Sequence, residues 1–322
     1  MLKISIALTL YNGEKYIFKQ LKSIHDQTYQ VDEVIICDDG SSDKSTEIVS
    51  QFISDKKLHG HWKLYINKDN KGYTRNFLDC AKMTTGNIIF FCDQDDIWYP
   101  NKIERMAKEF EKNQMVKALS CRFLIINSKD EIVKSFYNSI RKGKGNLEKR
   151  TFTSQVKDNI SGGLTLAIRR ETLVEIEPII RKYNLAFDVP IGLLTSIEGG
   201  YYILWEPLMY RRVHSNNVSA PKLSLKSRLL NVNNHIEGRE YHANLLKMCV
   251  EERGNQLNKV ERRNLITTIK SHENYVTNLK KRAILPLVSD IFTFNPMKNY
   301  FVVSTNILCS LFGKYENINN KE

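Results

Sequence analysis

Three carboxylates lie within four consecutive residues, Asp93-Gln94-Asp95-Asp96, which we call the acidic run. Carboxylates this crowded repel one another unless a proton or a cation lies between them. Hard divalent ions prefer oxygen ligands of this kind, and Mg²⁺ commonly shares them with substrate phosphates. Asp96 alone could instead cap a helix that starts near Pro100. A cap explains one Asp and not three, so the acidic run predicts a metal and nucleotide site.

Two upstream segments could contribute to the same site. Asp38-Asp39-Gly40-Ser41 could place a carboxylate against a base N–H or a ribose hydroxyl, or it could be only a turn before a helix capped by Ser42 or Asp43. Asn70-Lys71-Gly72, followed by Arg75, opens another helix, where anions are favoured and Arg can grip phosphate. A solvated helix start explains this second segment nearly as well.

Two later residues are candidates whose ordinary interpretations are structural. Asp188 precedes Val189-Pro190, and an Asp at that position commonly caps the following helix. His214 is either a satisfied surface histidine or a ligand, and a single histidine does not decide between these interpretations.

The elements that must position these residues alternate regularly over the first hundred positions. Apolar runs at 3–9, 33–37, 62–66 and 87–92 predict buried strands, and the segments between them have helical spacing. Continuous apolar strands separated by amphipathic helices predict a parallel sheet covered on both faces. Ligands bind beyond the carboxyl ends of such strands, so the polar residues that follow three of them should meet at one edge.

The remaining chain is less regular. Strands are expected at 118–127 and 162–169, an edge strand at 202–212, helices at 170–180 and after Asp188, and a polar, basic loop at 138–159. From position 221 the pattern is helical and basic, with 16 Lys and Arg against 9 Asp and Glu over residues 222–322. We therefore expect a catalytic domain over 1–220 and a helical region over 221–322.

Composition limits the class of protein and its compartment. The chain has 322 residues, 42% of them hydrophobic, and a net charge of +12, which would attract phosphates or anionic lipids. Its six cysteines form no CxxC pair, so we expect a reducing compartment without disulfides or zinc. The first residues resemble a strand rather than a signal peptide, and no window of about 18 apolar residues predicts a membrane span. These features predict a cytoplasmic protein that does not bind nucleic acid, because no aromatic-basic pattern of a known module is present.

In combination, these motifs resemble those of the family-2 inverting glycosyltransferases with the GT-A fold, a nucleotide-diphospho-sugar transferase fold of α/β class with a mostly parallel, Rossmann-like sheet. The resemblance covers about residues 1–218 and rests on five segments in this order: Thr9-Leu10-Tyr11-Asn12-Gly13, Asp38-Asp39-Gly40-Ser41, Asn70-Lys71-Gly72, Arg75-Asn76, and the acidic run with Ile97-Trp98. The form DQDDIW, with the later stretch RRVHSNNVS, is similar to the rhamnosyltransferase-like branch of bacterial polysaccharide synthesis.

The resemblance implies a role for each matching residue. Those implied to surround the nucleotide are Thr9, Tyr11, Asn12, Asp38, Asp39, Arg75 and Asp93. Asp95, Asp93 and His214 are implied to hold Mg²⁺ or Mn²⁺. Asp188 matches the catalytic base, although this branch often has His-Asp at that position and this chain has Phe187-Asp188.

The function implied is transfer of a sugar, rhamnose in this branch, from a nucleoside-diphosphate-sugar donor to a lipid-linked saccharide acceptor. The alternatives are a transferase that uses a UDP-hexose and a non-catalytic protein that binds cations or nucleotides. A dinucleotide-dependent oxidoreductase would need GxGxxG after the first strand, where this chain has YNGEKY. The basic region, with its apolar and aromatic stretch at 284–312, suggests peripheral contact with the inner face of the plasma membrane, a homodimer interface, or packing on the catalytic domain.

Overall fold

The computed structural model describes residues 2–133, 145–158, 162–214, 217 and 232–281. The chain divides into two compact units, residues 1–152 with 159–217 and residues 153–158 with 218–322. Among the described helices, none is both long enough and apolar enough to span a membrane. The apolar and aromatic stretch at 284–312 lies outside the described residues.

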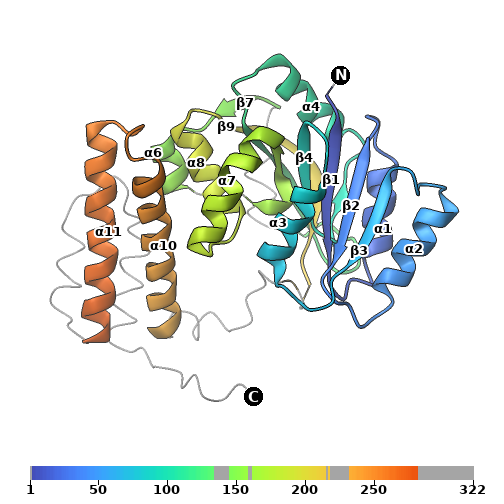
Figure 1. The fold of residues 1–322 in the computed structure, drawn as a ribbon, viewed down its shortest axis with the longest axis horizontal. Coiled ribbons are helices and arrows are strands. Elements are labelled where there is room, and N and C mark those ends of the chain that lie inside the picture. The colour runs from blue at the N-terminus through green and yellow to red at the C-terminus, as the bar shows by residue number, and fades with distance from the viewer. Residues whose placement is uncertain (1, 134–144, 159–161, 215–216, 218–231, 282–322) are drawn as a thin grey trace. The chain divides into compact units, whose positions relative to one another are not determined.

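A nine-stranded mixed sheet forms the centre of the first unit, in the order β3-β2-β1-β4-β8-β6-β9-β5, with β7 paired to β9 (Figure 1). Its strands are β1 (Ile4–Leu10), β2 (Glu33–Asp38), β3 (Trp62–Ile66), β4 (Ile88–Cys92), β5 (Ile97–Trp98), β6 (Ala118–Ile126), β7 (Leu147–Lys149), β8 (Leu166–Arg169) and β9 (Tyr201–Arg212). Strands β1 to β4 are parallel to one another, and β5, β7 and β8 run antiparallel to their neighbours. The predicted α/β class with a mostly parallel sheet is confirmed.

Helices cover both faces of this sheet. They are α1 (Ile17–His25), α2 (Ser45–Asp55), α3 (Tyr73–Met83), α4 (Lys102–Lys112), α7 (Arg170–Tyr183) and α8 (Asp188–Ile197). Apolar residues of α1, α2 and α4 form one core with β1, β2 and β4. On the opposite face the rings of Phe77, Phe91 and Phe187 lie 4.7–6.0 Å apart and join α3 and the start of α8 to β4.

The register of the parallel strands brings their carboxyl ends to one level. Leu10 pairs with Asp38, Asp38 pairs with Ile66, and Leu8 pairs with Cys92. The residues that follow β1, β2 and β4 therefore share one edge of the sheet, as the strand pattern predicts.

Two expectations for the middle of the chain are wrong. The predicted loop at 138–159 contains β7 and the short helix α6 (Phe152–Lys157). The segment at 202–212 is not an edge, because β9 pairs with β6 on one side and with β5 and β7 on the other. Both errors have one cause: β7 and β9 are fixed by partners distant in sequence, which local composition does not reveal. The strand expected at 162–169 begins as a 3-10 turn, Gly163–Thr165, and continues as β8.

The second unit contains two long helices, α10 (Val232–Arg253) and α11 (Lys259–Lys280). Asn258 caps α11 through a reciprocal pair of bonds with Glu261, which satisfies two exposed backbone donors. A small core joins the helices and consists of Val232, Ile236, Tyr275, Val276 and Leu279.

Candidate active site

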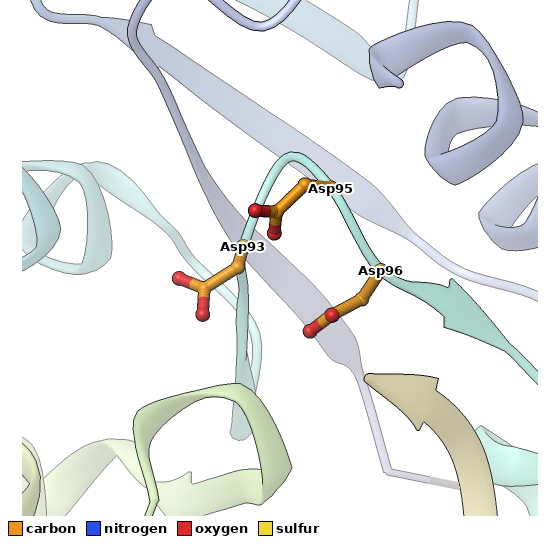
Figure 2. Close-up of side chains that lie close together, drawn as sticks. All are labelled: Asp93, Asp95 and Asp96. Atoms are coloured by element: carbon orange, nitrogen blue, oxygen red, sulfur yellow. The ribbon is translucent and has the colours of Figure 1, made fainter. Parts of the chain in front are cut away.

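The acidic run forms the turn between β4 and β5 (Figure 2). One carboxylate oxygen from each of Asp93, Asp95 and Asp96 lies within 4.8 Å of the other two. Figure 2 shows all three side chains directed to the same side of the turn. Asp95 is 9% exposed and Asp96 is 2% exposed, so water screens their charges poorly.

This crowding changes the proton affinity of the cluster. Burial, followed by the negative charges of Asp95 and Asp188, raises the pKa of Asp93 to about 7, while Arg211 opposes the shift. Burial and the charges of Asp95 and Asp93 raise the pKa of Asp96 well above its usual range. Full ionisation of the cluster is therefore unfavourable unless positive charge is brought to it.

Asp96 does not cap a helix, so that structural interpretation is wrong. Its Oδ1 accepts a hydrogen bond of 3.0 Å from the backbone N–H of Arg212, and α4 begins only at Lys102, after Asn101. Its Oδ2 is buried and has no hydrogen-bond partner among the described residues. A buried oxygen without a donor is a good position for a cation ligand or for a bound proton.

Asp95 is held by residues far along the chain. His214 Nε2 lies 2.9 Å from Asp95 Oδ2, and the Asn217 side-chain amide donates a 2.9 Å bond to the same oxygen. The sequence indicated His214 as a candidate ligand, but it gave Asn217 no role beyond its place in the stretch RRVHSNNVS. The imidazole can hold Asp95 through an N–H, or it can present its Nε2 lone pair to a cation beside Asp95.

Arg212 and Tyr16 support this arrangement, and sequence reasoning missed both. Arg212 is 1% exposed, and its Nε donates a 2.8 Å bond to the backbone carbonyl of Asp95. Its guanidinium also pairs with Asp130 and lies 4.7 Å from the centre of the Tyr16 ring. The other ring neighbour of Tyr16 is His214, with ring centroids 4.7 Å apart and planes at 28°. Tyr16 thus fixes the plane of His214.

Asp38 and Asp39 build the loops at the edge of the sheet. Asp38 accepts bonds from the backbone N–H groups of Gly40 and Ser41 at 3.1 and 2.9 Å. Asp39 accepts bonds from the backbone N–H groups of Lys71 and Gly72, both at 2.9 Å, which ties β2 to the start of α3. Gly72 has a φ of +79°, a conformation that side chains disfavour. Both carboxylates are buried.

The turn after β1 is joined directly to the acidic run. Gln94 accepts a 2.7 Å bond from the backbone N–H of Tyr11 and donates a 2.9 Å bond to its carbonyl. The Asn12 side chain accepts a 2.9 Å bond from the backbone N–H of Ser42. These bonds leave the Tyr11 side chain 50% exposed beside the acidic run, with Thr9 half-buried below it in β1.

Arg75 is exposed on the first turn of α3, at the same edge of the sheet. The start of α3 also lies close to two carboxylates. Burial, followed by the negative charges of Asp188 and Asp93, raises the pKa of Tyr73. Tyr73 is 46% exposed, so its phenol is accessible to solvent within the electrostatic reach of these two carboxylates.

Asp188 is the first residue of α8, and Phe187 holds the cap position. Its Oδ2 accepts a 3.1 Å bond from the backbone N–H of Gly163, and its Oδ1 accepts a 2.9 Å bond from that of Val189. A Cβ on Gly163 would lie 2.6 Å from the Phe187 ring, so glycine is needed for this approach. Burial raises the pKa of Asp188, against the effect of the two N–H donors. A half-buried carboxylate with a raised pKa and free lone pairs can accept a proton.

Together these residues suit a hard divalent cation. The donor atoms are carboxylate oxygens and one imidazole nitrogen, the buried Asp96 Oδ2 lacks a donor among the described residues, and burial and the neighbouring carboxylates raise the pKa of Asp93. The structure brings Asp93, Asp95 and His214 to one place, puts Asp188 within electrostatic reach of Asp93, and keeps Tyr11 and Arg75 at the exposed edge.

Comparison with known proteins gives a consistent result. Residues 5–173 match the sequence model described as Glycosyl transferase family 2. A dTDP-rhamnosyl transferase of Shigella flexneri is 29% identical over 233 residues, which are 69% of this chain and 76% of that protein. A UDP-Glc:alpha-D-GlcNAc-diphosphoundecaprenol beta-1,3-glucosyltransferase of Escherichia coli is 32% identical over 170 residues, 53% of this chain and 61% of that protein. The chain spans at most 66% of the length of four of its most similar curated relatives.

Solved structures share the fold. S. aureus TarS 1-349 in complex with UDP-GlcNAc superposes with a TM-score of 0.59 at 16% identity, covering 84% of this chain and 72% of that one. A mannosyltransferase from Pyrobaculum calidifontis in complex with GDP-Man and Mn²⁺ gives a TM-score of 0.53 at 14% identity, covering 96% and 86%.

Proposed function

The chain belongs to glycosyl transferase family 2 and has the GT-A fold, and from this premise we propose that it is an inverting glycosyltransferase that uses a nucleoside-diphosphate-sugar donor. One observation carries the proposal. The acidic run, with His214 and Asn217 on Asp95, lies close enough to Asp188, a carboxylate with a raised pKa, for the charge of Asp188 to raise the pKa of Asp93. Such a pair supplies a site for the diphosphate and a site for proton removal.

Asp93, Asp95 and His214 are the proposed ligands of Mg²⁺ or Mn²⁺. The crowding of their donor atoms and the buried, unpartnered oxygen of Asp96 support this assignment. A bound cation would offset the negative charge that develops on the leaving diphosphate. Arg212 and Tyr16 hold Asp95 and His214 in position, so the protein fixes this geometry before a ligand arrives.

The proposed nucleotide site lies at the shared edge of β1, β2 and β4. Its contact surfaces are Thr9, Tyr11, Asn12, Arg75 and Asp93. The exposed Tyr11 ring can stack on a base, and the exposed Arg75 can pair with a phosphate. Two further residues of this site shape its loops through their bonds to backbone N–H groups: Asp38 and Asp39.

Asp188 is the proposed general base. Inversion requires one in-line displacement, in which the acceptor hydroxyl loses its proton as it attacks the anomeric carbon. Each oxygen of Asp188 holds one backbone N–H and keeps a second lone pair for that proton. The raised pKa brings the carboxylate closer to the working pH, which strengthens it as a base.

The finer assignments rest on the named relatives. The Shigella relative is a dTDP-rhamnosyl transferase, which supports rhamnose as the donor sugar, whereas the Escherichia relative is a UDP-Glc transferase, which supports a UDP-hexose. The name of the latter includes a diphosphoundecaprenol acceptor, which supports a lipid-linked acceptor in cell-surface polysaccharide synthesis. A lipid-linked acceptor would in turn require peripheral contact with the inner face of the membrane, and a homodimer is a second proposed use of the basic region.

Donor hydrolysis tests the proposed function. The protein is incubated with a panel of dTDP, UDP and GDP sugars and Mn²⁺, without acceptor, and release of nucleoside diphosphate is measured. We expect slow release from one donor class, abolished by chelation and by Asp95→Asn, while the exposed-surface control Lys63→Gln keeps it. Mn²⁺-dependent binding without any release or transfer from any donor would instead identify a non-catalytic nucleotide-binding protein.

A further inference from the structure

Arg122, in the middle of β6, is a buried cation that neither the fold nor the proposed mechanism uses. Its side chain is among the largest fully buried ones, at 2% exposure. Within the described part of the chain, its Nε and Nη2 atoms have no hydrogen-bond partner and no carboxylate forms an ion pair with it. Two acidic residues of this part of the sheet pair with other cations: Glu148 with Arg150, and Glu206 with Arg105.

An unpaired guanidinium in this position is costly. Arg cannot be deprotonated in a protein, so it cannot avoid the cost of burial by losing its charge. Buried charges are normally paired, because desolvation without a partner is strongly unfavourable. Among the described residues, the contacts of the Arg122 guanidinium are the ring faces of Trp205 and Phe123, with centroids 5.3 and 5.8 Å from its Cζ. These contacts leave two N–H-bearing nitrogens unused.

The strand directions place Arg122 toward the same edge of the sheet as the acidic run, and the register between β6 and β9 shifts on each side of Arg122. Phe90 of β4 and Leu119 of β6 both pair with Ala167 of β8. Asp93 is three residues beyond Phe90, and Arg122 is three residues beyond Leu119. Since β4 and β6 run in the same direction on either side of β8, both residues follow the paired segment toward the same edge of the sheet.

Asp188 lies between these two positions. Its carboxylate is anchored to Gly163, the first residue of the 3-10 turn that leads into β8, the strand that separates β4 from β6. On the β6 side, Ser120 meets the Tyr201 hydroxyl at 2.8 Å, and the charge of Asp188 adds to burial in raising the pKa of Tyr201. The order across the sheet is therefore acidic run, base, and then Arg122.

We propose that Arg122 binds an oxyanion, a carboxylate or a phosphate, carried by the saccharide acceptor. The inference rests on the proposed function, because it assigns the two sides of Asp188 to donor and acceptor. The donor diphosphate belongs at the acidic run, so a group beyond the base belongs to the molecule that the base deprotonates. The guanidinium fork matches carboxylate and phosphate oxygens in pairs, and the Trp205 face can pack on a sugar ring.

Anion binding without metal or nucleotide tests the subsite directly. Inorganic phosphate and glucuronate are titrated calorimetrically into the wild type, Arg122→Met and the exposed control Arg262→Met. We expect the wild type and the control to bind at least one anion, the stronger one identifying the charged group, and Arg122→Met to bind it at least about tenfold more weakly. Equal affinity in Arg122→Met, or no binding of either anion by the wild type, overturns the proposal.

The melting temperature of Arg122→Met is a second test, because an unpaired Arg122 and a structurally paired Arg122 predict opposite changes in it. If the guanidinium is unpaired, Arg122→Met without anion should melt at the wild-type temperature or above it. A lower melting temperature, or failure to fold, would show that the charge already has its partner within the protein and would refute the assignment.

Two further arms separate this inference from the proposed function. Asp95→Asn should lose Mn²⁺-dependent binding of nucleoside diphosphate and keep its anion affinity, whereas Arg122→Met should show the reverse. Saturating nucleoside diphosphate with Mn²⁺ should not displace the anion from the wild type. Displacement would place the anion in the donor diphosphate site and overturn the acceptor-side assignment, while leaving the transferase function intact.

Discussion

Replacing Asp188 by Asn separates a catalytic role from a structural one. The substitution keeps the size and shape of the side chain but removes its ability to take a proton. If Asp188 is the base, kcat should fall by about 10²–10⁴-fold, the usual contribution of a general base. Donor affinity should remain, because the loss affects only an interaction made in the transition state.

The structural cost of the same change follows from two hydrogen bonds. Asp188 accepts one backbone N–H on each oxygen, from Gly163 at 3.1 Å and from Val189 at 2.9 Å. An Asn has one accepting oxygen, so one N–H would face an amide group instead. Loss of one bond to a charged acceptor costs about 1.5–3 kcal/mol, and each kcal/mol lowers the melting temperature of a domain of this size by about 2–4 °C. The variant should therefore remain folded at assay temperature.

Single-turnover kinetics with saturating donor, together with calorimetric donor binding and thermal melting, distinguishes the two effects. Glu206→Gln is the matched control, because Glu206 is a carboxylate paired with Arg105 at 3.0 Å, in the same unit of the protein. It should lose some stability and keep its turnover. Near-normal turnover in Asp188→Asn, or an equal loss in Glu206→Gln, would refute the assignment of the base.

Four further outcomes are expected. Asp95→Asn should abolish the Mn²⁺ dependence of nucleoside diphosphate binding in calorimetry, and unchanged dependence would remove the acidic run as the metal site. Tyr16→Phe should retain Mn²⁺ affinity while Tyr16→Leu weakens it several-fold, since only the ring orients His214; equal effects would mean that the stacking is unimportant. Because burial raises the pKa of Asp188, kcat should fall as pH drops through a value above the ordinary Asp pKa of about 4, and a limb at or below that value would argue against this base. In liposome flotation at low salt, the full-length protein should rise with anionic vesicles and not with neutral ones; indifference to both would reject the membrane proposal.

The parallel half of the fold could be predicted because its signals are local. The runs at 33–37 and 62–66 match β2 and β3 to within one residue, since continuous apolar strands between amphipathic helices have few alternatives. Local signals failed at β7, a three-residue strand within a polar, basic segment. It is stabilised by pairing with β9, more than 50 residues later along the chain, and nothing in its own composition requires a strand.

The candidate site likewise has one part that local sequence predicts and another part that depends on residues distant along the chain. The acidic run was apparent from spacing alone, because three adjacent carboxylates are hard to explain otherwise. Its supports were not apparent: Asn217 meets Asp95 across 122 positions, and Arg212 donates to the Asp95 carbonyl across 117. Arg212 belongs to the stretch RRVHSNNVS, which is part of the family resemblance. Only the pairing of β9 with β5 shows that Arg212 supports Asp95. Nothing in the sequence around Tyr16, at the start of a helix, indicates that its ring stacks on His214.

In the proposed mechanism, the antiparallel strand β8 allows one sheet to bind two substrates. The parallel strands β1, β2 and β4 bring their carboxyl ends, and with them the proposed nucleotide and metal residues, to one edge. Because β8 enters the sheet in the opposite direction, its amino-terminal end reaches that same edge, and Gly163 there anchors the proposed base, Asp188, at the start of α8. Beyond it, β6 again runs parallel to β4 and delivers Arg122. The proposed base, anchored beside β8 between two strands that carry opposite charges, is placed to act where a donor held at β4 and an acceptor held at β6 would meet.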